Sequence, residues 1–225
     1  YINSGLVKIY LWDPNTFKYS LLNTLTPPED GSIADNLQEQ NFGSSHKISE
    51  PGASSVRDTS TKYLFVGAPG YSDGTGRVYM YEWGLGVDGS TYDTWTQNLT
   101  ITSADPGAGK RFGHRIEANH NGDILAVSST SPGQAGKVEI YIRNSQANDG
   151  STDHSFTLAQ TLTGTSADGS SLNTAFGDSM SMVSDGTTLI IGAPGVDGTE
   201  QIDAGAVYYY KWNADDSTNT YTLQQ

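Results

Sequence analysis

An internal repeat constrains the fold of this chain more than any other feature of its sequence. Three Phe-Gly pairs, at residues 42–43, 112–113 and 176–177, stand 70 and 64 residues apart. A second marker is a glycine followed by alternating β-forming residues. It occurs four times, as GLVKIYLW from Gly5, GRVYMYEW from Gly76, GKVEIYIR from Gly136 and GAVYYYKW from Gly205. Two markers that share one period indicate a repeat architecture.

Each period contains four short runs of β-forming residues. Between the two markers lies an apolar run, in KYLFVGAPG from Lys62, GDILAVSST from Gly122 and TTLIIGAPG from Thr187. A fourth run follows the second marker, in YSLLNTLTPP, WTQNLTITSAD, FTLAQTLTGTSAD and the final YTLQQ. Turn-forming residues separate the runs, and no segment has sustained helical periodicity. The pattern predicts an all-β array of four-stranded antiparallel sheets, which at this period is typical of β-propeller blades.

The apolar runs are continuous and do not alternate, as expected for inner strands that have other blades on both faces. The triplet Gly192-Ala193-Pro194 then ends its strand. Small residues permit close backbone approach, and proline lacks the N–H donor that would continue the ladder. We therefore expect Phe-Gly to begin one strand and Gly-Ala-Pro to end the neighbouring strand.

The paired segments NFGSSHKI with LFVGAPG, RFGHRIEA with LAVSSTS, and AFGDSMSM with LIIGAPG resemble FG-GAP repeats, the blade motif of integrin α-chain-like propellers. The resemblance covers nearly the whole chain as a single segment. It comprises three complete repeats at approximately 5–75, 76–135 and 136–204, and a partial one at 205–225. The middle copy has Ser128-Ser129-Thr130 where the Gly-Ala-Pro triplet would stand. The resemblance implies an extracellular or surface-exposed module that supports adhesion, recognition or scaffold building.

Three complete repeats are fewer than the four to eight blades of a closed propeller. The runs GLVKIYLW and GAVYYYKW are the same strand of the repeat, so the two ends duplicate each other and do not complete one split blade. We expect either a segment of a longer array or an open stack whose copies join into a fibre, because an uncapped array exposes sheet faces and edges. The expected partners are further blades of the same chain or copies of the chain itself.

Composition excludes several classes of partner. The formal net charge is −13 with only 12 Lys and Arg, and no basic cluster is present, which excludes nucleic acid as the expected partner. The chain contains no run of about 18 apolar residues, which is the length that a membrane span requires. The absence of cysteine excludes disulfides and thiolate metal sites.

Cation binding has one candidate cluster. The cation loops of integrin-like propellers have the form D-x-D-x-D-G, but the corresponding loops here read EPGASSVRDTSTK, ANHNGD and VSDGTT, so the family's site is not transferred. The Asp-Gly pairs of the chain are better explained as turn formers. The remaining candidate for Ca2+ is Asp197, Glu200 and Asp203 in GVDGTEQIDAG. No other cofactor is expected.

No motif in the sequence predicts catalysis. The stretch DPGAGKR lacks the first glycine and the final Ser or Thr of a phosphate-binding loop, and it precedes a strand and not a helix. The four histidines are scattered without the spacing of a metal site. No nucleophile elbow or Ser/His/Asp constellation stands out. The chain is therefore predicted not to be an enzyme, and an enzyme whose chemistry lies outside this segment is a third alternative.

The leading functional hypothesis is a noncatalytic scaffold module of a large surface or appendage glycoprotein that forms filaments. Asn98-Leu99-Thr100 is the only Asn-x-Ser/Thr tripeptide, so Asn98 is the predicted site of N-glycosylation.

The alternative hypothesis is an adhesion or recognition propeller that binds protein or glycan ligands through its inter-strand loops. The contact residues predicted for it are the aromatic side chains Tyr71, Tyr92 and Trp95. Trp83 and Trp212 are instead expected to cover blade edges.

Overall fold

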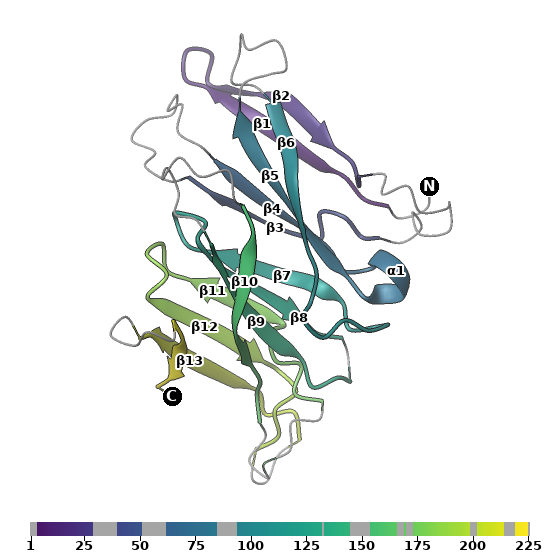
Figure 1. Ribbon diagram of the computed structural model, residues 1–225, viewed down its shortest axis with the longest axis vertical. Helices are drawn as coiled ribbons and strands as arrows, with labels where there is room; N and C mark the ends of the chain where they lie inside the picture. The colour runs from purple at the N-terminus through teal and green to yellow at the C-terminus, as the bar shows by residue number, and fades with distance from the viewer. Residues whose placement is uncertain are drawn as a thin grey trace.

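The structure is a computed structural model of the chain. It describes residues 4–28, 40–50, 62–84, 94–131, 133–144, 154–165, 169, 173–198, 202–213 and 219–224. Apart from one four-residue helical turn, α1 (Tyr71–Gly74), the elements in these ranges are all strands (Figure 1). The prediction of an all-β fold is confirmed.

The strands form one two-stranded and three four-stranded antiparallel sheets. The N-terminal hairpin comprises β1 (Val7–Asp13) and β2 (Lys18–Leu25). The first four-stranded sheet comprises β3 (Ser45–Ser49), β4 (Tyr63–Ala68), β5 (Arg77–Gly84) and β6 (Thr94–Ile101). The middle sheet comprises β7 (Phe112–Ala118), β8 (Ile124–Ser129), β9 (Lys137–Arg143) and β10 (Phe156–Leu162). The last sheet comprises β11 (Ser179–Met182), β12 (Thr188–Ala193), β13 (Ala206–Trp212) and β14 (Tyr221–Leu223).

In every four-stranded sheet, the strands lie in chain order, and the strand with the Phe-Gly pair at or just before its start comes first. The strands that follow the marker glycines, β5, β9 and β13, are each the third strand of a sheet. A sequence repeat that begins at a marker glycine therefore takes the last two strands of one sheet and the first two strands of the next. In the described residues, the hairpin supplies the equivalents of the third and fourth strands alone.

Phe-Gly and Gly-Ala-Pro lie side by side, as the sequence predicts. The Gly43 N–H donates to the carbonyl oxygen of Gly67 at 2.9 Å, and the Gly177 N–H donates to that of Gly192 at 3.0 Å. In the middle sheet, Phe112 is opposite Ser129. Phe-Gly therefore marks the start of the first strand in each sheet, and Gly-Ala-Pro marks the end of the second strand in the first and last sheets.

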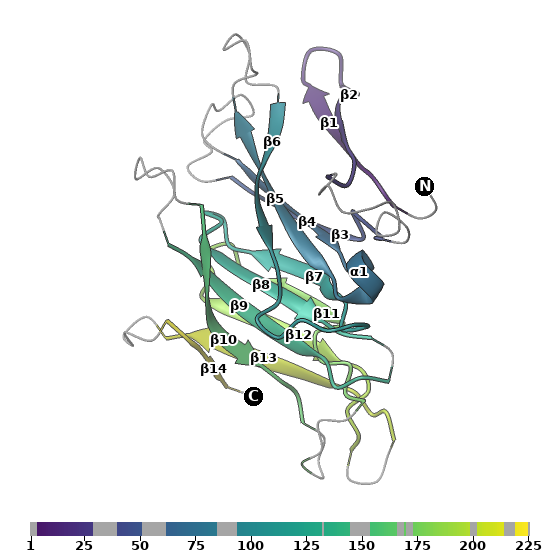
Figure 2. The same cartoon turned by 45° about the vertical axis from the view of Figure 1, so that its right-hand side comes forward.

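The sheets pack face to face along the longest axis of the molecule, with the hairpin at one end and the last sheet at the other (Figures 1 and 2). Three buried apolar clusters fill the three junctions between successive sheets. The described residues do not close into a ring, since the hairpin and the last sheet lie far apart in both views. The propeller arrangement thus stays a prediction.

The first strands of the three four-stranded sheets are next to one another. The Ser45 hydroxyl on β3 donates to the Gly113 carbonyl on β7 at 2.7 Å, and Lys47 pairs with Glu117 at 2.6 Å. His114 on β7 lies 3.3 Å from the carboxylate of Asp178, which precedes β11. Polar contacts therefore connect the sheets along their first strands, while the large apolar side chains pack between the second and third strands.

The burial of the second strands shows whether one or both faces of a sheet are covered by neighbouring sheets. All six residues of β4 are buried, as expected for a strand between two neighbouring sheets. The corresponding strand of the last sheet, β12, is equally apolar, but its Ile190 is 41% exposed. The prediction that both faces of such a strand are covered is therefore confirmed for β4 and wrong for β12 within these residues. Among the described residues, the last sheet has a neighbour on one face only.

Candidate functional site

One backbone contact recurs at all three junctions between sheets, and we call it the clasp. In each case, the Phe of a Phe-Gly pair donates its N–H to the residue that precedes the marker glycine of the previous sheet. The donor–acceptor pairs are Phe42 with Ser4 at 3.0 Å, Phe112 with Thr75 at 3.2 Å and Phe176 with Ala135 at 3.1 Å. The Phe-Gly pair therefore has a second role besides starting a strand, which is to hold its sheet against the preceding one.

The clasp requires glycine for two separate reasons. Gly5, Gly76 and Gly136 have φ angles of 82°, 81° and 72°, in the left-handed region that side chains disfavour. In addition, a Cβ at these positions would lie 2.0, 2.1 and 2.2 Å from the carbonyl oxygen of the clasped Phe. No side chain fits in that space without moving the backbone of the next sheet.

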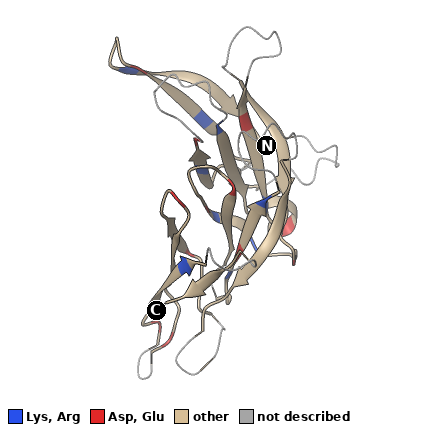
Figure 3. Cartoon of the chain, turned by 60° about the vertical axis from the view of Figure 1, so that its left-hand side comes forward, with Lys and Arg blue, Asp and Glu red and all other residues tan. Residues whose placement is uncertain are grey.

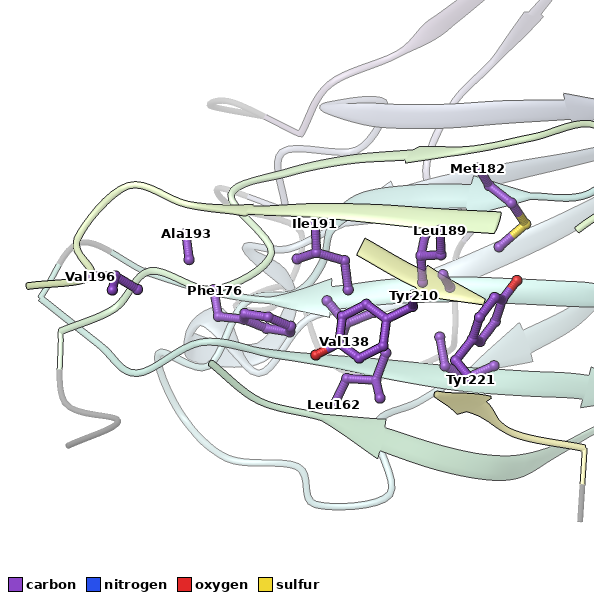
Figure 4. Packing of buried hydrophobic residues seen from close by; sticks show 12 residues of the cluster. Val138, Leu162, Phe176, Met182, Leu189, Ile191, Ala193, Val196, Tyr210 and Tyr221 are labelled. Atoms are coloured by element: carbon purple, nitrogen blue, oxygen red, sulfur yellow. The ribbon is translucent and has the colours of Figure 1, made fainter. Parts of the chain in front are cut away.

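Each clasp places an aromatic ring between two sheets. Phe112 and Phe176 are completely buried and Phe42 is nearly so. Phe176 belongs to the cluster that also contains Val138 and Ile191 (Figure 4). Fully burying a phenylalanine contributes about 1.5–3 kcal/mol relative to leaving it exposed. The clasp thus combines backbone registration with apolar burial.

The last sheet has the marker glycine of the clasp, but among the described residues no Phe lies against it. Gly205 has a φ angle of 73°, close to that of Gly136. The atom nearest to a Cβ built on Gly205 is the carbonyl oxygen of Pro194, at 3.6 Å. The three Phe-Gly pairs of the sequence are all engaged in the other clasps.

The apolar face beside this glycine is exposed, whereas its equivalents are buried. A valine stands two residues after each marker glycine; Val78 and Val138 are completely buried, but Val207 is 69% exposed. On the second strand, Ala126 is completely buried, but its equivalent Ile190 is exposed. We call the surface formed by Ile190, Ala204, Gly205, Val207 and Tyr209 the open face.

The hairpin is uncovered on its opposite face. A tyrosine occurs five residues after every marker glycine. Tyr81, Tyr141 and Tyr210 are at most 5% exposed, whereas Tyr10 of the hairpin is 51% exposed. Burial raises the pKa of Tyr210 to about 12. At the internal junctions, the valine-bearing face of one sheet packs against the tyrosine-bearing face of the next sheet. The stack therefore ends in one uncovered surface of each kind, the open face on the last sheet and the tyrosine-bearing face on the hairpin.

A buried polar cluster lies in the middle sheet. The Glu139 carboxylate is almost completely buried and accepts from Lys137 at 2.7 Å, from the Tyr141 hydroxyl at 2.7 Å and from the Ser103 hydroxyl at 2.9 Å. Burial, together with the neighbouring Glu139 carboxylate, raises the pKa of Tyr141. Sequence reasoning missed this cluster, although a charged residue inside the β-forming run GKVEIYIR was a signal for it.

A cavity of about 250 Å3 adjoins this cluster, where the middle copy departs from the Gly-Ala-Pro pattern. Its lining includes Ser129, Thr130, Lys137 and the ion pair of Lys110 with Asp105, whose atoms are 2.5 Å apart. Lys110 holds the pKa of the Asp105 carboxyl below its usual value. The hydroxyls of Ser129 and Thr130 are buried and have no hydrogen-bond partner among the described residues.

The structure describes two of the three residues predicted to bind a cation. The Asp197 carboxylate accepts the backbone N–H of Asp203 at 2.8 Å, which closes the loop between β12 and β13. Glu200 lies outside the described residues. Within the described ranges, no three His, Cys, Asp or Glu side chains group closely enough to hold a metal ion. The Ca2+ site stays a prediction.

The prediction that aromatic side chains contact a ligand is wrong for two of the three residues. Tyr71 is buried because the Arg77 guanidinium covers its ring at 3.4 Å, and Trp95 is buried against Trp83, with ring centroids 5.3 Å apart. Tyr92 lies outside the described residues. Trp83 and Trp212 are partly buried against the core, and the expectation that they cover blade edges stays a prediction.

Asn98 is exposed on β6, the outermost strand of its sheet, and its side-chain amide donates to the Glu82 carboxylate. The charged residues of the described chain are scattered and form no basic patch (Figure 3).

No protein-family model matches this sequence, and a search of curated proteins finds no match. In the described part of the chain, no helix is long and apolar enough to cross a membrane.

Proposed function

We propose that this chain is a noncatalytic structural module, a segment of an FG-GAP-like β-propeller array that builds a large surface or filamentous appendage protein. The observation that carries the proposal is the clasp, which joins every pair of successive sheets by the same backbone contact and leaves uncovered apolar surfaces at the ends of the stack. A module built in this way serves to pack against further modules. Repeat arrays derive much of their stability from such nearest-neighbour interfaces.

The propeller arrangement is supported by the order of the strands and by the contacts along one side of the stack. In each four-stranded sheet, the strands run in order from first to fourth, as in a propeller blade. The polar contacts of Ser45 with Gly113 and of His114 with Asp178 connect first strands. First strands that lie close to one another are what blades around a common axis require.

An extracellular or cell-surface location is part of the proposal. It is supported by the exposure of Asn98 on an outer strand, together with the resemblance to FG-GAP propellers. Mass spectrometry of the native protein is expected to find an N-glycan on the peptide that contains Asn98. Unmodified Asn98 in protein recovered from the cytoplasm would contradict the location.

Cross-linking of the native assembly tests the structural role. Amine-reactive cross-linking followed by mass spectrometry is expected to connect Lys211 in the last sheet and Lys8 in the hairpin to modules outside these residues. Lys47 and Lys137, which form ion pairs inside the stack, serve as controls and should link mainly within it. Single particles of one stack in electron micrographs, with no external links at either end, would refute the proposal.

A second candidate function is recognition of a small polar ligand in the cavity beside Ser129 and Thr130. It is favoured by the two buried hydroxyls, which have no partner in the described part of the chain, because such groups cost free energy unless something bonds to them. Titration calorimetry with a panel of mono- and disaccharides tests this candidate. Saturable binding that Ser129→Ala abolishes would support it, and no heat of binding across the panel would exclude sugars.

A further inference from the structure

The open face of the last sheet has the geometry of an internal junction at which only one partner is present. At the equivalent junction, Gly136 and Val138 of the middle sheet meet Phe176 and the apolar face of the last sheet (Figure 4). Gly205 and Val207 stand at the same positions of the third strand. The φ angles of Gly136 and Gly205 are 72° and 73°, so the backbone is already in the clasp conformation without a partner.

The chemistry of the clasp defines what this face can accept. The partner has to present a backbone N–H to the Ala204 carbonyl and an aromatic ring beside Val207, followed by a glycine that permits close approach. Gly43, Gly113 and Gly177 meet this need in the existing clasps, with φ angles of 86°, 88° and 89°. A Cβ on Gly113 would lie 2.8 Å from the Arg77 carbonyl oxygen.

A folded second copy of this chain cannot supply these groups. Its three Phe-Gly pairs are occupied by its own marker glycines, and its exposed hairpin has no Phe-Gly strand. A copy that packed its hairpin on the open face would cover Val207 but leave the Ala204 carbonyl unused.

We propose that the open face binds a further four-stranded repeat that begins with Phe-Gly and lies outside these 225 residues, joined through a fourth clasp at Ala204 and Gly205. This inference rests on the proposed function and identifies the partner of the last sheet. The new Phe donates its N–H to the Ala204 carbonyl, and its ring lies against Val207. The sheet that follows covers Ile190 and Tyr209.

Thiol labelling tests the fourth clasp, because the chain has no native cysteine. Residues 161–225 are appended after Gln225, which stands in YTLQQ where Gln160 stands in FTLAQTL, so the repeat pattern continues without a break. Val207→Cys is expected to react rapidly with Ellman's reagent in the 225-residue chain. In the extended chain, its labelling should be slower by on the order of 100-fold, as for a residue buried in a stable interface.

Three matched controls isolate the clasp from other effects. Val138→Cys should be protected in both chains, because its junction is complete. An extension with residues 161–172 alone completes the fourth strand without a Phe-Gly sheet, and it should leave Val207→Cys reactive. Gly205→Asn should restore labelling in the full extension and change little in the 225-residue chain, since asparagine tolerates a positive φ but its Cβ has no room beside a clasped Phe.

The outcomes separate this inference from the proposed function. Rapid labelling of Val207→Cys in the fully extended chain would overturn the inference, because the appended repeat already packs on the equivalent face of the middle sheet. Protection in the 225-residue chain that increases with concentration, with a dimer in sedimentation, would overturn it in favour of a second copy. The cross-linking experiment on the native assembly tests independently whether the ends of the stack are joined to anything.

Discussion

At the scale of single residues, glycine and phenylalanine control how the sheets meet. Gly5, Gly76 and Gly136 are not merely turn residues, because each leaves a space that the backbone of a Phe in the next sheet fills. The contact is made by main-chain atoms, so the side chains next to it can vary without breaking it. The middle copy varies in this way, with Ser129 and Thr130 where the other copies have alanine and proline.

Gly136→Ala and Gly205→Ala form a matched pair that measures the clasp. Both residues have nearly the same positive φ, so both substitutions cost about 1 kcal/mol in backbone strain. Only at Gly136 does the new Cβ meet the Phe176 carbonyl oxygen, and we expect a further loss of about 1–3 kcal/mol there. Urea unfolding monitored by tryptophan fluorescence gives both values, and equal losses would show that the clasp is not a steric constraint.

The sequence predicted the strand pairing around these residues but not the clasp itself. Alternating β-formers and the recurring Gly-Ala-Pro triplet are local signals, and Gly43 and Gly67 are neighbours as expected. A hydrogen bond from Phe42 to the Ser4 carbonyl leaves no signal beyond a glycine, since it involves main-chain atoms that are far apart in the sequence. Tyr71 was predicted wrongly for a similar reason, because its burial depends on how Arg77 packs over it.

At the scale of elements, a strand's burial depends on its place in the stack as much as on its own composition. β4 and β12 have similar apolar sequences, yet the first is buried on both faces and the second on one. Gln160 on β10 exchanges hydrogen bonds with the backbone of Tyr221 on β14 across a junction. The first strands also make polar contacts across junctions. His114 on β7 illustrates this, with Asp178 before β11 opposite it and Arg111 and Arg115 near it.

The free energy of unfolding is expected to change with pH near neutrality because His114 gains or loses a proton. Burial is the main cause that lowers the pKa of His114 below its usual value of 6.5; Arg115 lowers it further and Asp178 partly opposes the shift. The unfolded state therefore binds the proton more readily than the folded state. The free energy of unfolding should be highest above pH 6.5, and this contribution is lost as the pH falls through the lower folded-state value.

The control for this pH dependence is the exposed His46 on β3. His114→Gln should flatten the stability profile below pH 6.5, whereas His46→Gln should leave its slope unchanged. Chemical denaturation at a series of pH values provides the measurement. An identical slope in the His114→Gln protein would assign the pH dependence to other groups.

At the scale of the whole molecule, the described residues form a stack that is covered inside and uncovered at its ends. Exposed large apolar side chains are concentrated in the hairpin and the last sheet, among them Tyr10, Phe17, Val207 and Ile202. The sequence predicted three complete repeats and a partial one, and the structure has three four-stranded sheets and a hairpin. Closure into a propeller could not be predicted from the period alone, because blade number is a property of the complete assembly.

The rate of amide hydrogen exchange should increase from the middle of the stack to its uncovered ends. Amides of β8, in the middle sheet, have covered faces on both sides and are expected to exchange on the order of 100-fold more slowly than those of β1 and β14. β4 serves as a control, because it is buried on both faces but belongs to a different sheet. Mass spectrometry of exchanged peptides provides the comparison. Uniform protection from the hairpin to the last sheet would mean that the stack unfolds as one unit with no weaker ends.

The positions of the two termini have a mechanical consequence. The first described strands form the hairpin at one end of the stack and the last ones form the sheet at the other end, so a pulling force on the chain passes through the three junctions in series (Figure 2). Within the described ranges, the junction between the hairpin and the first sheet has two strands on one side, and Ile48 beside it is 46% exposed. Under tension, this junction should part first, and the hairpin would lengthen the molecule and dissipate energy while the other two clasps still hold.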